Sequence, residues 1–137
     1  MSLNRRKERE IAFQMLFAAQ FSPEADSETL YEDFMGECEE EGARDSLYIR
    51  TTFFGVREYT PEAKELIEKA AVGWKLERIS KATLTILLLA LYEMNRSGDV
   101  PVKIAINEAV ELAKKFDEDK APKFVNGVLG ALAGTEK

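Results

Sequence analysis

The sequence lacks histidine entirely and contains one cysteine, Cys38, among its 137 residues. A single cysteine cannot form a disulfide within the chain, and without histidine a Cys/His zinc site is excluded. The absence of histidine also removes the side chain that most often acts as a general base at neutral pH. Cys38 is therefore expected to be a small, partly buried thiol in a reducing compartment such as the cytosol.

Sequence motifs that mark common enzyme sites are also missing. The chain has no GxGxxG, no GxxxxGK[ST] and no GxSxG motif, which exclude the usual dinucleotide, P-loop and nucleophile-elbow sites. The segment 127–130 begins and ends with glycine but lies in an apolar stretch, so it is interpreted as a packing feature. These absences favour a binding protein over an enzyme, with no cofactor and no metal expected.

The chain has no apolar run long enough to cross a membrane. Its most apolar segment, 80–94, has no charge between Lys81 and Glu93, but a spanning helix needs about 20 apolar residues. Because this segment is rich in leucine and alanine, it is predicted to be a helix, with Ser80 as its N-cap. A helix that is apolar on nearly every side must be covered by others, so this is the expected central core helix. The charged N-terminus has no apolar signal segment, and a cytoplasmic protein without membrane association is expected.

The charge of the chain is acidic overall but unevenly distributed. The formal net charge is −6 and the pI is about 4.9, which argues against general nucleic-acid binding. Four of the first nine residues are nevertheless basic, namely Arg5, Arg6, Lys7 and Arg9. They crowd the first turn of a predicted helix, where the helix dipole disfavours positive charge. Two interpretations remain open: a local polyanion-binding surface, or a solvated helix end with Arg/Glu pairs.

Helical periodicity extends along most of the chain. Because no segment alternates with period two, an all-α fold without a sheet is predicted. The expected helical segments are 5–21, 27–41, 43–59, 61–72, 80–94, 101–116 and 123–132, with a short turn at 77–79. Thr60 and Pro61 are interpreted as a helix start, with proline at the first helical position. Pro101 and Pro122 are expected to begin helices in the same way.

The apolar spacing also predicts which side chains form the core. In the first four helices, the expected inner stripes are Ala12, Met15, Leu16 and Ala19; Leu30, Phe34 and Cys38; Leu47, Tyr48, Thr51 and Phe54; and Leu66, Ile67 and Ala70. In the helix that follows Pro101, they are Val102, Ala105, Ile106, Ala109, Leu112, Ala113 and Phe116. Trp74 is expected to pack in a connector. Gly127 and Gly130 each cost a helix about 1 kcal/mol, which predicts a close backbone approach as compensation.

Three segments resemble a known family. The segment 5–17, Arg-Arg-Lys-Glu-Arg-Glu-Ile-Ala-Phe-Gln-Met-Leu-Phe, resembles the first helix of NusB, the bacterial transcription antitermination factor. The segments 99–116 and 123–129 are similar to the C-terminal signature of that family, and Trp74 and Leu91-Tyr92-Glu93 also fit. The resemblance covers nearly the whole chain, and the two C-terminal segments are its most specific part.

The resemblance implies a fold, a function and partners. The fold would be about seven helices in a single domain of two packed helical halves, about 1–72 and 73–137. The function would be RNA binding to the boxA element of ribosomal RNA leader transcripts, together with the ribosomal protein NusE. Acting with the transcription elongation complex, the protein would promote read-through by RNA polymerase, without enzymatic activity of its own.

The resemblance also implies a set of RNA-binding residues. The expected set is Arg5, Arg6, Arg9, Gln14, Lys120, Lys123 and Phe124. The arginines and lysines would contact phosphates or base edges, Gln14 would read a base edge, and Phe124 would stack on a base or pack in the core.

The chain departs from the family at several positions. Where the family commonly carries tyrosine, this chain has Phe17, and where it carries an acidic-basic pair and an arginine, this chain has Thr83, Leu84 and Leu88. An apolar face there is either buried within the monomer, which is the favoured expectation, or exposed and self-associating.

Two other function classes remain as alternatives. One is an acidic helical protein–protein interaction module, either monomeric or homodimeric, with weak RNA binding. The other is an accessory domain of an RNA-modifying enzyme. Salt-dependent binding to a boxA-like single strand separates the RNA-binding class from the interaction module.

Overall fold

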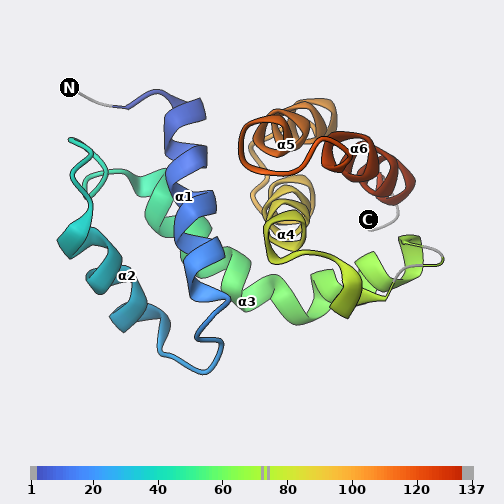
Figure 1. Ribbon diagram of the computed structural model, residues 1–137. Helices are drawn as coiled ribbons and strands as arrows, with labels where there is room; N and C mark the ends of the chain where they lie inside the picture. Colours follow the sequence, from blue (N-terminus) through green and yellow to red (C-terminus); the bar gives the residue numbers. More distant parts are fainter. Residues whose placement is uncertain (1–2, 72, 74, 134–137) are drawn as a thin grey trace. The chain divides into compact units, whose positions relative to one another are not determined.

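The computed structural model describes residues 3–71, 73 and 75–133, and among these every regular element is a helix (Figure 1). The predicted all-α fold is confirmed. The chain divides into two compact units, residues 1–57 and 58–137, and the boundary lies inside one helix. The halves expected from the sequence place that boundary near residue 72. Each unit is described by itself.

The helices of the first unit begin at side-chain caps. The unit contains α1 (Arg5–Ala19), α2 (Ser27–Glu37) and the first part of α3 (Leu47–Ala70). Asn4, Asp26 and Ser46 each accept a hydrogen bond from a backbone amide in the first turn that follows, at 2.8, 3.0 and 3.1 Å. A capping side chain satisfies one of the free amides of the first turn, so these residues determine where each helix starts.

The core of the first unit matches the prediction in α1 but not in α2 or α3. All four predicted side chains of α1 are buried. In α2 the predicted stripe is wrong by one position, because Tyr31 and Met35 are buried while the predicted residues are half-exposed. In α3, Leu47 is 77% exposed and Thr51 is exposed, and Tyr48 and Phe54 are only half-buried. The buried side chains there are Ile49, Thr52, Phe53 and Val56.

Aromatic contacts explain the register of α2. The Tyr31 ring lies 6.1 Å from the ring of Phe53 and 5.5 Å from that of Phe54, measured between centroids. A buried aromatic side chain removes more apolar area from water than the Leu30 side chain would, so this face of α2 packs inward.

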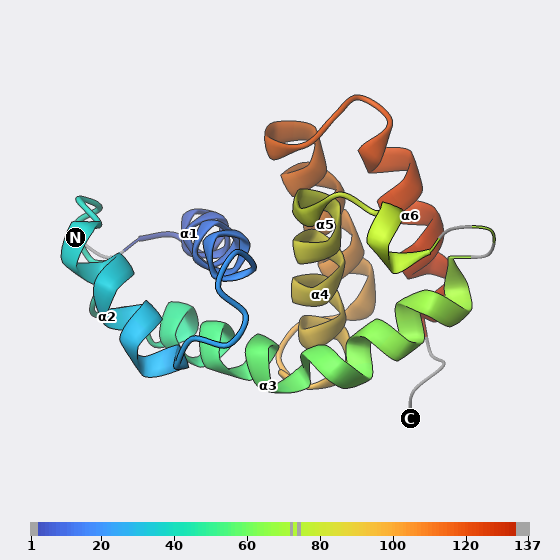
Figure 2. The same cartoon turned by 60° about the horizontal axis from the view of Figure 1, so that its bottom comes forward.

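The α3 helix continues through Pro61, so the predicted helix start at Thr60 and Pro61 is wrong (Figure 2). A proline inside a helix removes one backbone hydrogen bond and costs about 3 kcal/mol or more. Buried residues occur at helical spacing on both sides of the proline: Val56, Tyr59, Ala63 and Ile67. The burial of these side chains offsets the cost of the proline. The residues next to Pro61 do not reveal this burial, so they cannot show that the helix continues.

The second unit is built on three helices that all contact one another. They are α4 (Lys81–Asn95), α5 (Val102–Phe116) and α6 (Ala121–Leu132), preceded by the short 3₁₀ helix η1 (Leu76–Arg78) (Figure 1). Every residue of α4 from Thr83 to Glu93 is buried, and Ser80 caps the helix by accepting from the amide of Thr83 at 3.1 Å. The predicted central core helix and its N-cap are confirmed.

The α5 and α6 helices match most of the prediction. Ala105, Ala109, Leu112 and Ala113 are buried, whereas Ile106 and Phe116 are half-buried and Val102 is 38% exposed. The prediction that Val102 belongs to the buried stripe is therefore wrong. Pro122 lies in the first turn of α6 as expected.

The glycines of α6 do not mark a close approach. A Cβ atom added at Gly127 or Gly130 would meet nothing within 4 Å. The predicted close backbone contact at these glycines is therefore wrong.

The part of α3 that follows Pro61 matches its prediction at one of three positions. Ile67 is buried as predicted, while Leu66 and Ala70 are half-buried. The predictions for Val72 and Trp74 lie outside the described residues.

Candidate nucleic-acid interface

The start of α1 carries three basic side chains that reach solvent. Arg5 and Arg6 are exposed and Lys7 is half-exposed, in the first turn that Asn4 caps. Lys7 pairs with Glu40, with 3.4 Å between Nζ and Oε1, and both side chains remain more than 40% exposed. An exposed pair of this kind contributes little to folding and separates readily, so Lys7 stays available to a polyanion.

Arg5 is held in place by two neighbours. Its Nε donates to Oε1 of Glu8 at 3.1 Å, and its guanidinium carbon lies 4.3 Å from the ring centroid of Tyr48. Glu8 in turn accepts a hydrogen bond from the hydroxyl of Ser46 at 2.5 Å. These contacts connect the start of α1 to the start of α3 within the first unit, while the Arg5 side chain remains 54% exposed.

Arg9 lies in a different environment. It is only 4% exposed, and its guanidinium carbon lies 5.7 Å from the ring of Tyr48. A buried guanidinium is costly unless it is paired, so this side chain belongs to the interior of the structure. The sequence-based role of Arg9 in RNA binding stays a prediction that requires the side chain to become exposed.

Gln14 is exposed on α1, as a base-edge contact requires. It follows Lys7 by seven residues, so the two side chains share one face of the helix. Phe17, at the position where the family commonly has tyrosine, is half-buried. Its ring lies 5.4 Å from that of Phe21, edge to face, and Phe21 is 62% exposed.

The other predicted RNA-binding residues lie at the start of α6 in the second unit. Lys120 precedes the helix and is exposed, Lys123 is exposed in its first turn, and Phe124 is half-buried. The half-buried ring of Phe124 fits neither a fully packed core position nor a fully open stacking face. The end of α5 adds Lys114, which pairs with Glu111 at 3.2 Å, and Lys115, whose Nζ lies 5.6 Å from the Phe116 ring.

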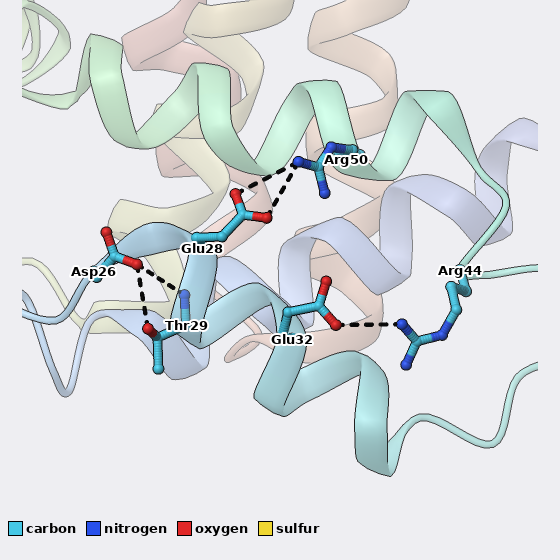
Figure 3. A network of polar contacts seen from close by, with 6 residues as sticks. All are labelled: Asp26, Glu28, Thr29, Glu32, Arg44 and Arg50. Atoms are coloured by element: carbon cyan, nitrogen blue, oxygen red, sulfur yellow. Dashed lines mark hydrogen bonds and ion pairs between the residues drawn. The ribbon is translucent and has the colours of Figure 1, made fainter.

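Acidic side chains of α2 pair with one arginine of α3 and with one arginine of the loop between α2 and α3 (Figure 3). Arg50 pairs with Glu28 at 3.3 Å and lies over the rings of Tyr31 and Phe54, and Arg44 pairs with Glu32 at 3.3 Å. The hydrogen bond that Arg50 donates to Glu28 is the main cause that raises the pKa of Arg50. Arg50 joins α3 to α2, and Arg44 joins the loop between these helices to α2, which distinguishes both from the basic residues that begin α1.

Sequence reasoning missed Ser46 and Tyr48 as parts of the site. Ser46 carries the N-cap signal of α3, but no pattern in one sequence indicates that a cap hydroxyl also contacts a carboxylate on another helix. Tyr48 was expected in the core, and it is half-buried because one face of its ring is covered by Arg5.

The positions at which the chain departs from the family are buried. Leu84 is 8% and Leu88 5% exposed, which confirms the favoured expectation of burial within the monomer. Thr83 is buried as well, and its hydroxyl donates to Oδ2 of Asp117 at 2.5 Å. This hydrogen bond joins the start of α4 to the end of α5.

The part of the chain that the structure describes holds neither a metal-binding cluster nor a membrane-spanning helix. Its cysteine and carboxylate side chains form no group of three or more that could hold a metal ion. None of its helices is both long enough and apolar enough to cross a membrane.

The arrangement of helices matches solved structures of one class, the NusB-type all-helical proteins. T. maritima NusB superposes with a TM-score of 0.85 at 31% identity, covering 99% of this chain and 94% of that one. A structure described as antitermination factors NusB and NusE in complex with dsRNA contains a chain that matches with a TM-score of 0.78 at 25% identity, covering 94% and 95%.

Sequence comparison gives the same result. The model of the NusB family matches residues 6–134. The transcription antitermination protein NusB of Limosilactobacillus fermentum is 46% identical over 98% of this chain and 96% of its own length. NusB of Bacillus velezensis is 40% identical over 95% of each chain. The chain belongs to the NusB family.

Proposed function

We propose that this chain is an RNA-binding transcription antitermination factor that binds the boxA element of ribosomal RNA leader transcripts together with NusE. Membership of the NusB family supports the antitermination role, because the relatives carry that name. The similar chain solved in a complex of NusB, NusE and dsRNA supports RNA and NusE as partners. On this proposal the protein works in the cytoplasm, with the elongation complex, and without catalysis.

The observation that carries the proposal is the exposed basic start of α1 on an acidic chain. Arg5 and Arg6 reach solvent there, although the whole chain has a net charge of −6. Single-stranded RNA is bound through phosphate contacts and through bases that stack or hydrogen-bond at their edges. Arg5 and Arg6 contact phosphates on this proposal, and Gln14 contacts a base edge.

Lys120, Lys123 and Phe124 at the start of α6 are a second set of contacts in the proposal. The two lysines are exposed and supply charge, and the partly accessible ring of Phe124 supplies a stacking face. Base stacking on an aromatic side chain contributes about 1–3 kcal/mol per base.

The overall charge explains why a partner is required. An acidic protein attracts a polyanion weakly at long range, so local basic contacts alone give limited affinity. A second protein that binds both this chain and the RNA raises the affinity of the complex by linking the two interactions. We therefore expect boxA to bind much more tightly when NusE is present.

The experiment measures the affinity of a fluorescent boxA single strand by anisotropy at several salt concentrations, with and without NusE. The Arg5→Ala/Arg6→Ala double variant should weaken binding and lower the salt slope by about 0.7 per lost phosphate contact. The Arg44→Ala variant removes one charge from an exposed ion pair elsewhere in the same unit and is the matched control. An unchanged affinity and salt slope in the double variant would contradict the proposal.

One observation favours the alternative of a protein–protein interaction module. Val102 and Ile104, in the first turn of α5, are 38% and 49% exposed. Neighbouring apolar side chains on a surface often mark a protein contact. If the wild-type chain forms a concentration-dependent dimer, lost in Ile104→Lys, and binds boxA no better than a scrambled strand with or without NusE, this alternative replaces the RNA-binding function.

A further inference from the structure

The guanidinium of Arg5 is restrained on two sides and open on the third. Its Nε donates to Glu8, and one face of the group lies 4.3 Å from the Tyr48 ring centroid. Among the described residues, the terminal Nη atoms have no hydrogen-bond partner. These two nitrogens form the planar edge that arginine uses to bind a phosphate through two parallel hydrogen bonds.

The restraint on Arg5 originates in α3. Ser46 accepts a hydrogen bond from the amide of Ile49, which fixes the serine at the start of that helix. The same hydroxyl donates to Glu8 at 2.5 Å, so the carboxylate that binds Arg5 is itself held from the opposite side. Tyr48 lies two residues further along, in the first turn of α3. Both restraints on Arg5 therefore depend on the beginning of a single rigid element.

This arrangement has a consequence for binding. A free arginine side chain loses rotamer entropy when it is immobilised. If folding has already fixed the side chain, a ligand that binds the Nη edge does not have to order it again, and the affinity is higher. A cation–π contact to a tyrosine ring and a hydrogen bond to a carboxylate are strong enough to provide such restraint on a partly exposed arginine.

We propose that Tyr48 and Ser46 are positioning residues, which hold Arg5 as a preformed phosphate-binding fork for RNA. Tyr48 acts by direct stacking and Ser46 acts through Glu8. The inference rests on the proposed function, because it assigns the ligand of the fork as an RNA phosphate. It differs from a stacking role for Tyr48, in which the ring would contact a base itself.

The first measurement needs no RNA. The order parameter of the Nε–H bond of Arg5, obtained by NMR relaxation in the full chain, reports whether the side chain is fixed. We expect a value above the flexible range, which lies below about 0.6, and a decrease in Tyr48→Leu but not in Tyr48→Phe, which keeps the ring. Ser46→Ala should also lower the value. Ser80→Ala, which removes the comparable cap of α4, is the matched control and should not.

The second measurement is a double-mutant cycle on RNA affinity, with a boxA single strand as the probe. Tyr48→Leu should weaken binding about 3- to 10-fold, the range expected for re-ordering one long side chain. In an Arg5→Ala background the same substitution should have almost no further effect, because Tyr48 acts through Arg5. Tyr48→Phe should bind like the wild type, and thermal melts of each variant exclude unfolding as the cause.

The outcomes separate the inference from the proposed function. If wild-type protein does not bind boxA with or without NusE, the proposed function and the inference both fail. If it binds, but Arg5 is flexible or Tyr48→Leu weakens binding equally in the Arg5→Ala background, the inference alone is overturned. An equal weakening by Tyr48→Leu in the Arg5→Ala background would mean that Tyr48 contacts the RNA directly.

Discussion

The contacts within the first unit differ from the contacts within the second unit. Among the described residues of the first unit, ion pairs join α2 to α3 and join both α1 and α2 to the loop between α2 and α3. Four arginines of this unit lie against aromatic rings. The second unit also has ion pairs, between Arg96 and Glu62 and between Lys114 and Glu111, but its α4 is buried from Thr83 to Glu93. Exposed ion pairs contribute little to stability, whereas apolar burial contributes about 25 cal/mol per Å². We therefore expect the second unit to provide most of the stability and the first most of the polar contacts with ligands.

The largest expected effect is that of a charge inserted into the apolar unit. Leu88→Arg places an unpaired guanidinium at a position that is 5% exposed, and we expect it to cost about 3–5 kcal/mol in the free energy of unfolding. The same substitution at Leu47, which is 77% exposed in the first unit, should change stability by no more than about 0.5 kcal/mol. Thermal and denaturant unfolding of both variants measure the difference.

The oligomeric state provides a second check on Leu88. Because the side chain is buried within one chain, light scattering should give the same mass for the wild type and for any folded Leu88→Arg protein. A wild-type dimer that becomes a stable monomer on this substitution would show that the leucine face is an intermolecular contact.

A smaller loss of stability is expected when the hydrogen bonds of Arg57, here called the Arg57 clamp, are removed from the first unit. Arg57 of α3 donates from Nε to the hydroxyl of Ser27 at 2.7 Å and from Nη2 to the carbonyl of Ala25 at 2.9 Å. Arg57→Ala should cost about 1.5–3 kcal/mol, the range for hydrogen bonds to a charged group. Arg57→Lys should not restore the loss, because lysine lacks the planar fork.

The control for the Arg57 clamp is a pair on the same unit that is open to solvent. Arg44→Ala removes the exposed pair with Glu32 and should cost less than about 1 kcal/mol in chemical denaturation. Equal costs for Arg57→Ala and Arg44→Ala would mean that the hydrogen bonds of Arg57 contribute no more than a surface ion pair.

These contacts explain why the sequence predicts one unit better than the other. The α4 helix is apolar on nearly every side, so its burial follows from composition without knowing which face points inward. In α2 and α3 apolar and aromatic residues occupy two adjacent stripes, and periodicity alone cannot choose between Leu30 and Tyr31. The choice depends on rings and arginines from other helices, which a single-sequence pattern does not contain.

The same reasoning applies to the candidate site. Its charge could be predicted, because Arg5 and Arg6 lie in a short basic segment of an acidic chain. The burial of Arg9 and the contact between Arg5 and Tyr48 could not be predicted, because both depend on how α3 begins relative to α1 within the first unit. Pro61 illustrates the same limit, since a local start signal is overridden by burial on both sides of it.

A stabilising effect is expected from the glycines of α6. A Cβ atom at Gly127 or Gly130 would meet nothing within 4 Å, and alanine is favoured over glycine inside a helix by about 1 kcal/mol. Gly127→Ala and Gly130→Ala should each raise the midpoint of thermal unfolding. A loss of stability in either variant would indicate that the second unit packs more closely at α6 than the structure shows.

The smallest expected effect is on the free energy of unfolding at alkaline pH. Burial is the main cause that raises the pKa of Tyr92 above its ordinary value of 10.0, and the negative charges of Glu93, Asp99 and Glu58 raise it further. Because the unfolded phenol ionises first, the stability contributed by neutral Tyr92 is complete below pH 10 and is lost as the pH rises through the folded pKa. Tyr92→Phe should reduce the alkaline fall in the free energy of unfolding. An identical fall in both proteins would exclude Tyr92 as a contributor.

The central claim, that the first unit binds RNA through the start of α1, is tested most directly by an NMR titration of the ¹⁵N-labelled chain with a boxA single strand in the presence of NusE. We predict that the amide signals of residues 4–9 and 46–49 shift with added RNA beyond the shifts caused by NusE alone. A scrambled strand should produce smaller shifts at the same residues. RNA-dependent shifts confined to α5 and α6, with none in the first turns of α1 and α3, would contradict the account.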